Sequence, residues 1–373
     1  MNSRLFTPFS IGTMALENRI TIAPMCQYSA VDGCMSDWHL MHLGSLAVSG
    51  AAMLVIEATA VTPQGRITPQ CVGLYSDASE AAIRRVVDFC RGISPIRIGI
   101  QLNHAGRKAS AQRPWEGRGA LSAAEGAWQT VAPSALPFAA GWPAPRALDR
   151  AGMVAITEAF VAAARRAARI GLDFIELHST HGYLLSEFLS PLANCRSDEY
   201  GGSLENRMRF PLEVFRALRE AWPAGKPLGA KISGSDFAEG GWTPEDAVIY
   251  ARELRKRGCA YVTVSGGGVV SSASIPVAPG YQVPFAAKVK QEAGIVTGAV
   301  GLISDPHQAE AIIADGKADF VSLARAMLFN PRWPQHAAIV LGAQNVFRPP
   351  QYERSSPRAW PPAAAIAQEH PQS

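Results

Sequence analysis

Residues 168–178, with the sequence ARIGLDFIELH, show the pattern from which the fold is predicted. A helical segment ends at Gly171, and a run rich in apolar residues follows it up to His178. Glycine directly after a helix supplies the left-handed conformation that ends it. A continuous apolar run is typical of a strand that is buried on both faces. The stretch therefore predicts a helix, a glycine turn and a buried strand in succession.

The same succession recurs along the chain. It is found in residues 46–60, 90–102, 256–266 and 314–324. With further apolar runs at residues 20–25, 227–234 and 294–301, the expected strands start near residues 20, 52, 96, 173, 228, 261, 295 and 319. Helix starts are marked as well, by the cap Thr243 with Pro244 and Asp246, and by Asp305 with Pro306.

Alternating strands and helices in this number predict an α/β fold, a closed parallel (β/α)8 TIM barrel. A doubly wound sheet is the alternative, but no GxGxxG turn follows the first expected strand. We expect a single-domain barrel over residues 1–344 that begins with an N-terminal hairpin. A long loop rich in Pro, Gly, Ala and Trp, at about residues 104–150 after the third strand, is expected to cap it. Residues 345–373 are expected to leave the barrel as a proline-rich tail.

The composition excludes several classes of protein. The 373 residues are 48% hydrophobic and 18% charged, which is enough for a large core, and the net charge of +4 is spread along the chain. Neither a nucleic-acid footprint nor an apolar segment long enough to span a bilayer is present in the sequence, so we expect no nucleic-acid or membrane partner. The six cysteines form no CxxC pair, which argues against a zinc ribbon, an iron–sulfur cluster and a disulfide framework and favours a reducing, cytoplasmic setting.

Polar residues gather where the expected strands end, the end at which TIM barrels carry their active sites. The fourth strand ends at His178, with His181 and Tyr183 just beyond. The loops after the seventh and eighth strands are the usual phosphate site of such barrels. Carboxylates are scarce at these ends, which weakens a metal-dependent hydrolase and a glycosidase. A phosphate-bearing cofactor is the better interpretation, and no metal site is expected.

Five motifs resemble the old yellow enzyme family of flavoproteins. They are APMCQYSA (23–30), EATAVTPQGRI (57–67), QLNHAGRKAS (101–110), ELHSTHGYLLSEFLSPLANCRSDEYGGSLENRMRF (176–210) and GAVGLI (298–303). The likeness runs from about residue 4 to residue 354 and is strongest to the thermophilic-like branch, with bacterial xenobiotic reductases and NADPH dehydrogenases. It implies an FMN-containing barrel that uses NADPH or NADH to reduce the activated C=C bond of enones, enals and similar compounds.

The resemblance also assigns roles at the substrate. It implies that His178 and His181 bind the carbonyl oxygen and that Tyr183 is the general acid, with Tyr28 as a further substrate contact. Arg354 matches the arginine that this branch lends to a neighbouring subunit, which implies a homodimer or homotetramer.

For the cofactor, the resemblance places a set of residues around FMN. The ring would contact Ala23, Pro24, Met25, Cys26, Ala60 and Gln101, and the phosphate would contact Gly301, Ala324 and Arg325. Lys231 stands where the family usually has arginine, and Asn103 and Cys195 are further departures. Three alternatives stay open: a reductase of quinones, nitro compounds or other xenobiotics, a barrel that binds FMN without turnover, and a metal-dependent hydrolase. A dienoyl-CoA reductase would need a cysteine cluster that the sequence lacks.

Overall fold

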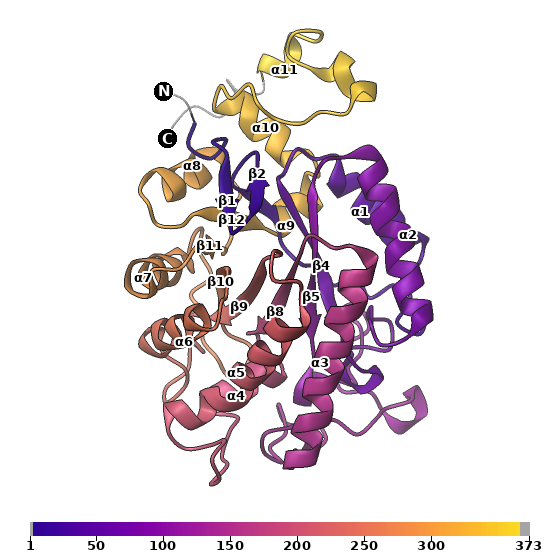
Figure 1. Cartoon of the computed structure of the whole chain (residues 1–373), viewed down its shortest axis with the longest axis vertical. Helices are drawn as coiled ribbons and strands as arrows, with labels where there is room; N and C mark the ends of the chain where they lie inside the picture. The colour runs from indigo at the N-terminus through magenta and orange to yellow at the C-terminus, as the bar shows by residue number, and fades with distance from the viewer. Residues whose placement is uncertain (1–2, 366–373) are drawn as a thin grey trace.

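The computed structural model, which describes residues 3–365, contains a closed barrel of parallel strands (Figure 1). In chain order these are β3 (Ile20–Ile22), β4 (Met53–Ala60), β5 (Arg97–Asn103), β8 (Phe174–Ser179), β9 (Leu228–Ser233), β10 (Tyr261–Ser265), β11 (Thr297–Ala299) and β12 (Phe320–Leu323). The barrel closes where β12 pairs in parallel with β3. Every expected strand start lies within two residues of an observed one, and the predicted TIM barrel is confirmed.

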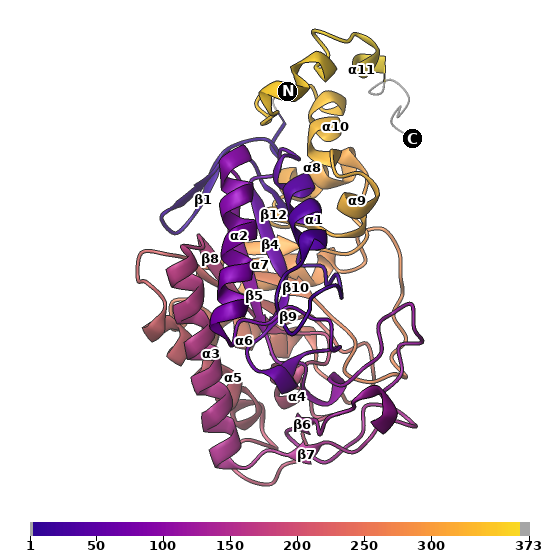
Figure 2. The same ribbon diagram turned by 90° about the vertical axis from the view of Figure 1, so that its right-hand side faces the viewer.

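Helices surround the barrel on its outside (Figures 1 and 2). They are α1 (Asp37–Ala47), α2 (Asp77–Ile93), α3 (Arg150–Ile170), α4 (Leu184–Leu189), α5 (Leu204–Ala221), α6 (Pro244–Lys256), α7 (Val283–Ala293), α8 (Pro306–Ala314), α9 (Arg325–Phe329) and α10 (Trp333–Val340). Outward strand residues such as Ile175 and Leu177 share one buried cluster with helix residues such as Phe160. The strands are therefore buried on both faces, as the apolar runs predict.

Most of the predicted helix boundaries are confirmed. Gly171 follows α3 with φ +88°, and Thr243 caps α6 by accepting a hydrogen bond from the backbone N–H of Asp246. Asp305 caps α8 in the same way. The expectation that Gly92 ends a helix is wrong, because α2 continues to Ile93. The residue that follows it, Ser94, is extended, as residues before proline tend to be.

The interior of the barrel is filled with aromatic rings at the end where the strands begin. Three rings occupy the space there, and each lies against a glycine of a neighbouring strand: Phe174 against Gly99, Tyr261 against Gly229, and Phe320 against Gly298. A Cβ on any of these glycines would lie 2.2–2.3 Å from a ring carbon. The predicted N-terminal hairpin, β1 (Phe9–Ile11) with β2 (Met14–Leu16), closes this end by packing on the same cluster.

Two segments lie outside the repeated units. The predicted capping loop after β5 contains the 3-10 turns η2 (Gly106–Lys108) and η3 (Ala123–Glu125) and the short strands β6 (Val131–Ala132) and β7 (Arg146–Ala147). The tail contains η4 (Pro350–Ser355) and α11 (Pro362–Ala365), and it lies at the end of the molecule opposite β6 and β7 (Figure 2). The last part of the predicted tail, residues 366–373, falls outside the described residues.

Candidate active site

Strand β8 carries side chains from the aromatic end of the barrel to its mouth. Successive side chains of a strand point to opposite faces. Phe174 lies in the interior cluster, and Glu176 accepts hydrogen bonds from Gln101 of β5 and Thr263 of β10. Because β10 is not adjacent to β8, the contact with Thr263 passes through the barrel interior. His178, two residues further along the strand, therefore stands at the mouth.

His178, His181 and Tyr183 come together there, as expected. The ring centroids of His178 and His181 are 5.2 Å apart, and those of His178 and Tyr183 are 5.0 Å apart. His181 and Gly182 both have positive φ, +62° and +70°. A Cβ on Gly182 would lie 2.0 Å from the carbonyl oxygen of Gly268, so only glycine fits this turn. Non-glycine residues with positive φ are found preferentially at functional sites.

Burial sets the protonation of these three groups. It lowers the pKa of both histidines well below the usual value, and the nearby Lys231 acts in the same direction, so both imidazoles are neutral at pH 7. His178 Nδ1 accepts from the backbone N–H of Thr180 at 3.4 Å, which assigns its proton to Nε2. Burial raises the pKa of Tyr183 well above its ordinary value, so the phenol keeps its proton.

A second group of predicted residues lies beside Tyr183. Cys26, Tyr28 and Tyr183 all pack against one small apolar cluster. Tyr28, with φ +50°, also meets Trp115 of the capping loop edge-on at 5.9 Å between ring centroids. Burial raises the pKa of the Cys26 thiol well above its usual range, and the Glu57 carboxyl adds to this, so the thiol is protonated. Of the remaining ring residues, Ala60 is buried at the end of β4 and Met25 packs against the main core.

A cavity of about 330 Å³ opens next to His181. Seven of the predicted residues line it: Ala23, Pro24, His181, Lys231, Gly301, Ala324 and Arg325. The lining supplies two cationic side chains, and no aspartate or glutamate is among the described residues that form it. Gly301 has φ +111°, and a Cβ there would lie 3.0 Å from the backbone nitrogen of Gln282, so the turn after β11 needs glycine. Cations and loop backbone after β11 and β12 fit a phosphate group.

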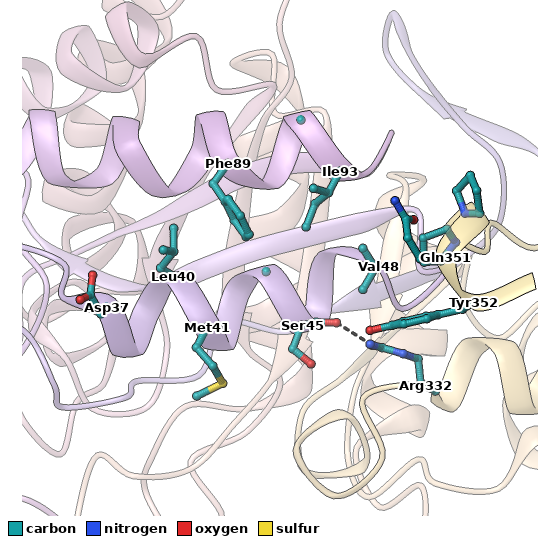
Figure 3. Close-up of a pocket in the computed structure, with 14 residues that line it drawn as sticks. Asp37, Leu40, Met41, Ser45, Val48, Phe89, Ile93, Arg332, Gln351 and Tyr352 are labelled. Carbon is teal, nitrogen blue, oxygen red and sulfur yellow. Dashed lines mark hydrogen bonds between the residues drawn. The ribbon is translucent and has the colours of Figure 1, made fainter. Parts of the chain in front are cut away.

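Arg354 lies elsewhere in this chain. It is exposed on η4, whereas the histidines lie at the mouth of the barrel. The first residues of η4 border a groove of about 570 Å³ between α1, α2 and the tail (Figure 3). Arg332 donates to the carbonyl oxygen of Ser45 at 2.7 Å and lies 5.3 Å from the centre of the Tyr352 ring, which fixes η4 against α1. One chain alone does not bring Arg354 to the other predicted residues.

Several residues that shape the site were not predicted. Ser265, the last residue of β10, has its Oγ 2.8 Å from His181 Nε2. Lys108 donates from Nζ to the carbonyl oxygens of His181 (2.8 Å) and Gly268 (2.9 Å), and it lies 5.1 Å from the centre of the Tyr183 ring. The signal for Ser265 was its place at the end of the sixth strand, and Lys108 lies inside the QLNHAGRKAS motif.

Among residues 3–365, no helix is both long and apolar enough to cross a membrane. The same residues contain no group of three or more His, Cys, Asp or Glu side chains placed to hold a metal ion. All six cysteines are free thiols.

Comparison with known proteins places this chain in a family. The model of the NADH:flavin oxidoreductase / NADH oxidase family matches residues 4–342. The chain belongs to this family. Its relatives include the NADPH dehydrogenase of Geobacillus thermodenitrificans, 44% identical over 95% of this chain and 99% of that protein. The NADPH dehydrogenase of Halalkalibacterium halodurans is 40% identical over the same shares of the two chains.

Comparison with solved structures agrees. Morphinone reductase is 30% identical, with a TM-score of 0.76 over 94% of this chain and 93% of that chain. A 2-naphthoyl-CoA reductase complex, with a TM-score of 0.81 over 91% of this chain and 52% of that chain, is only 22% identical and shares the fold alone. The predicted membership of the old yellow enzyme family is confirmed, and this flavin oxidoreductase is an enzyme that uses FMN and NAD(P)H.

Proposed function

We propose that this flavin oxidoreductase is an ene-reductase, which reduces the activated C=C bond of α,β-unsaturated carbonyl compounds by a ping-pong mechanism. The observation that carries the proposal is the group of His178, His181 and Tyr183, two neutral imidazoles and a protonated phenol, beside the cavity. These groups are a pair of hydrogen-bond donors and a proton donor, the two functions that such a reduction needs from the protein.

The two histidines bind the substrate's carbonyl oxygen. When bound, FMN supplies the hydride, taken from NAD(P)H and given to the substrate's β-carbon. Negative charge then develops on the carbonyl oxygen, and N–H donors fixed in a buried site stabilise it. His178 donates from Nε2, because its Nδ1 already accepts from Thr180. For His181 to donate from Nδ1, Ser265 must donate its hydroxyl proton to Nε2.

Tyr183 completes the reaction by giving its proton to the α-carbon. Its raised pKa keeps the proton on the phenol until charge develops in the substrate. Lys108, which lies against the Tyr183 ring and holds the His181 carbonyl, positions both partners. Tyr28, which meets Trp115 of the capping loop edge-on, is a further substrate contact.

For the cofactor we assign the residues that the resemblance implies. Ala23, Pro24, Met25, Cys26, Ala60 and Gln101 would surround the ring, with Lys231 as the cation at its pyrimidine edge. Gly301, Ala324 and Arg325 would hold the phosphate. The cationic cavity lining supports the phosphate position, and the place of Lys231 in the same lining supports its contact with the ring.

One experiment tests the proposed reaction. The purified holoenzyme is reduced with NADPH under nitrogen until the yellow colour bleaches, and candidate oxidants are then added separately. We expect 2-cyclohexenone to restore the colour and to be converted to cyclohexanone. Restoration by quinones or nitro compounds without any by enones would replace the proposal with a xenobiotic reductase. A protein that takes up FMN but is not bleached would be a binding barrel without turnover.

We also propose that the enzyme is a cytoplasmic homodimer or homotetramer, in which Arg354 reaches a neighbouring subunit's site. The exposure of Arg354 and the apolar side chains that border the adjacent groove support this: Met41 is 54% exposed and Phe89 is 44% exposed. Sedimentation analysis is expected to give two or four subunits, and Arg354→Ala is expected to raise the KM for enone. A monomeric enzyme with full activity would exclude the shared site.

A further inference from the structure

Glu176 is a buried carboxylate in the middle of the barrel that the proposed reaction does not use. Only 1% of the residue is exposed. Oε1 accepts from Gln101 Nε2 at 2.8 Å, and Oε2 accepts from Thr263 Oγ1 at 3.0 Å. Removing a carboxylate from water is costly unless hydrogen bonds and a nearby cation offset it. Two hydrogen bonds satisfy part of this requirement, and a cation is the remaining element.

Lys231 of the neighbouring strand is the cation that acts on this carboxylate, through charge and without a direct ion pair. It lies on β9, between β8 and β10, with His178 and Thr263 as its register partners on the two neighbouring strands. Lys231 is 6% exposed and lines the cavity. Burial lowers its pKa, and the carboxylate of Glu176 acts against this by raising it. Burial raises the pKa of Glu176, and the charge of Lys231 opposes this by lowering it.

The position of Glu176 along β8 matters as much as its charge. It lies one inward position below His178 and one above Phe174, so it separates the site from the aromatic filling. Since Gln101 Nε2 donates to Glu176, the amide has a fixed orientation and its carbonyl oxygen remains an acceptor. Glu176 thus joins two residues assigned to the flavin, one through a hydrogen bond and one through charge.

We propose that Glu176 is a positioning residue that holds Gln101 and Lys231 in place under the flavin ring. It acts through these two side chains and needs no contact with FMN or substrate. The inference rests on the proposed placement of Lys231 against the flavin. Its test distinguishes failure of the Glu176 role from failure of the Lys231 placement.

The test is a double-mutant cycle on the reduction potential of bound FMN. Lys231→Met is made in the wild-type enzyme and in Glu176→Gln, and the potential of all four holoenzymes is measured at one pH. In wild type the substitution is expected to lower the potential, because a cation near the ring is lost. In the Glu176→Gln background, Lys231→Met is expected to lower the potential by less than about half of the wild-type shift. The reason is that Lys231 has already lost the carboxylate that keeps it charged and in place. The direct effect of the Glu176 charge on the flavin cancels in this comparison.

The outcomes are distinct. Equal shifts in the two backgrounds would overturn the role of Glu176. No shift from Lys231→Met in wild type would instead refute the placement of Lys231, which belongs to the proposed function. Asp236→Asn is the matched control, since this buried carboxylate bonds to Ser190 and the backbone of Trp242, and the Lys231→Met shift should be unchanged there.

A second variant guards against misfolding of Glu176→Gln. Thr263→Val keeps the carboxylate and the side-chain shape but removes one of its two hydrogen bonds. We expect it to reduce the Lys231→Met shift in the same direction and by less. The unfolding temperature of each FMN-free protein shows whether the fold is retained. If Thr263→Val folds and leaves the shift unaltered, the hydrogen-bonded arrangement around Glu176 does not position Lys231.

Discussion

The two ends of the barrel interior are built from the same strands and have opposite chemistry. Where the strands begin, Phe174 and two other aromatic rings fill the space beside glycines, and the hairpin covers them. Phe174 lies on β8, and Glu176, two residues further along this strand, makes the interior polar. His178, a further two residues along, lies at the mouth. The aromatic end is a closely packed apolar cluster, whereas the mouth brings together His178, His181, Tyr183 and Lys231 among apolar lining residues.

The difference shows how one barrel keeps stability and chemistry apart. Close packing at the strand starts fixes the diameter and the stagger of the barrel. Buried polar groups at the mouth reduce stability unless they are paired. The packed aromatic cluster at the strand starts supports the strands that position these groups. Substitutions at the two ends should therefore affect different measurements.

The largest effect is expected at the mouth, from Tyr183→Phe. Loss of the proton donor should slow the half-reaction with enone by about 100-fold or more, because general acid catalysis contributes that much. The half-reaction with NADPH needs no proton from this residue and should change little. Stopped-flow absorbance measures the two steps separately.

Tyr200→Phe is the matched control, a buried tyrosine on the outside of the barrel whose hydroxyl bonds to Glu213. It should leave both half-reactions as they are. Equal slowing of the two half-reactions in Tyr183→Phe would remove the proton donor assignment. A large loss of unfolding free energy in that variant would mean that the mouth also contributes to stability. It would contradict the contrast drawn between the two ends of the barrel.

The next effect belongs to the aromatic end. In Gly99→Ala the new Cβ would lie 2.3 Å from the ring of Phe174, and overpacking of this kind costs about 2–3 kcal/mol of unfolding free energy. Urea unfolding of the FMN-free protein measures this, and the rate with enone per folded enzyme should stay the same. Phe174→Leu in the same chain should restore part of the loss.

Gly92→Ala provides the control for the glycine substitution. No atom lies within 4 Å of a Cβ at this position in α2, so alanine should stabilise the helix by about 0.5–1 kcal/mol. If both glycine variants changed stability by the same amount and sign, the rings would not be closely packed against Gly99.

The smallest effect concerns pH. Burial holds the pKa of His178 and His181 well below the ordinary histidine value of about 6.5, so at these two groups the unfolded chain binds more protons than the folded one as pH falls through that value. The contribution of these two groups to stability should therefore fall with decreasing pH, by up to about 1.4 kcal/mol per pH unit for each histidine. Urea unfolding between pH 6.5 and 5.5 measures the slope.

His178→Asn should make this slope shallower. An unchanged slope in His178→Asn would mean that the buried mouth does not account for acid sensitivity. The aromatic end contains no group that titrates in this range, so Gly99→Ala should shift the whole curve without changing its slope.

Much of the fold follows from local patterns in the sequence. Gly171, Thr243 and Asp305 are local signals for helix ends, and each acts as predicted. The prediction from Gly92 is wrong because one glycine destabilises a long helix only slightly. The helix α2 instead stops before Ser94, which is extended. The clustering of His178 with His181 and Tyr183 could also be predicted, since one short segment holds all three.

What the sequence could not supply is contact across the barrel. Glu176 and Thr263 are 87 positions apart, and no local pattern connects them. The direction of each side chain depends on where a strand begins, so the inward position of Glu176 became clear only from its partners. The proposed role of Arg354 depends on a contact between chains, which a single sequence does not contain. Lys108 and Ser265 likewise act through backbone and side-chain atoms of distant loops.

Closure of the barrel by β12 against β3 has a consequence for synthesis of the protein on the ribosome. The register pairs Ile22 with Leu323. During synthesis, β3 therefore cannot pair with β12 until almost the whole chain has been made. Until then β3 and β11 are unpaired edges, which attract other chains. Nascent chains that stop just before residue 320 should therefore depend on chaperones and be cut readily by protease, and resistance should appear once β12 has left the exit tunnel. Pulse proteolysis of stalled chains of increasing length would show whether protection arises at that point.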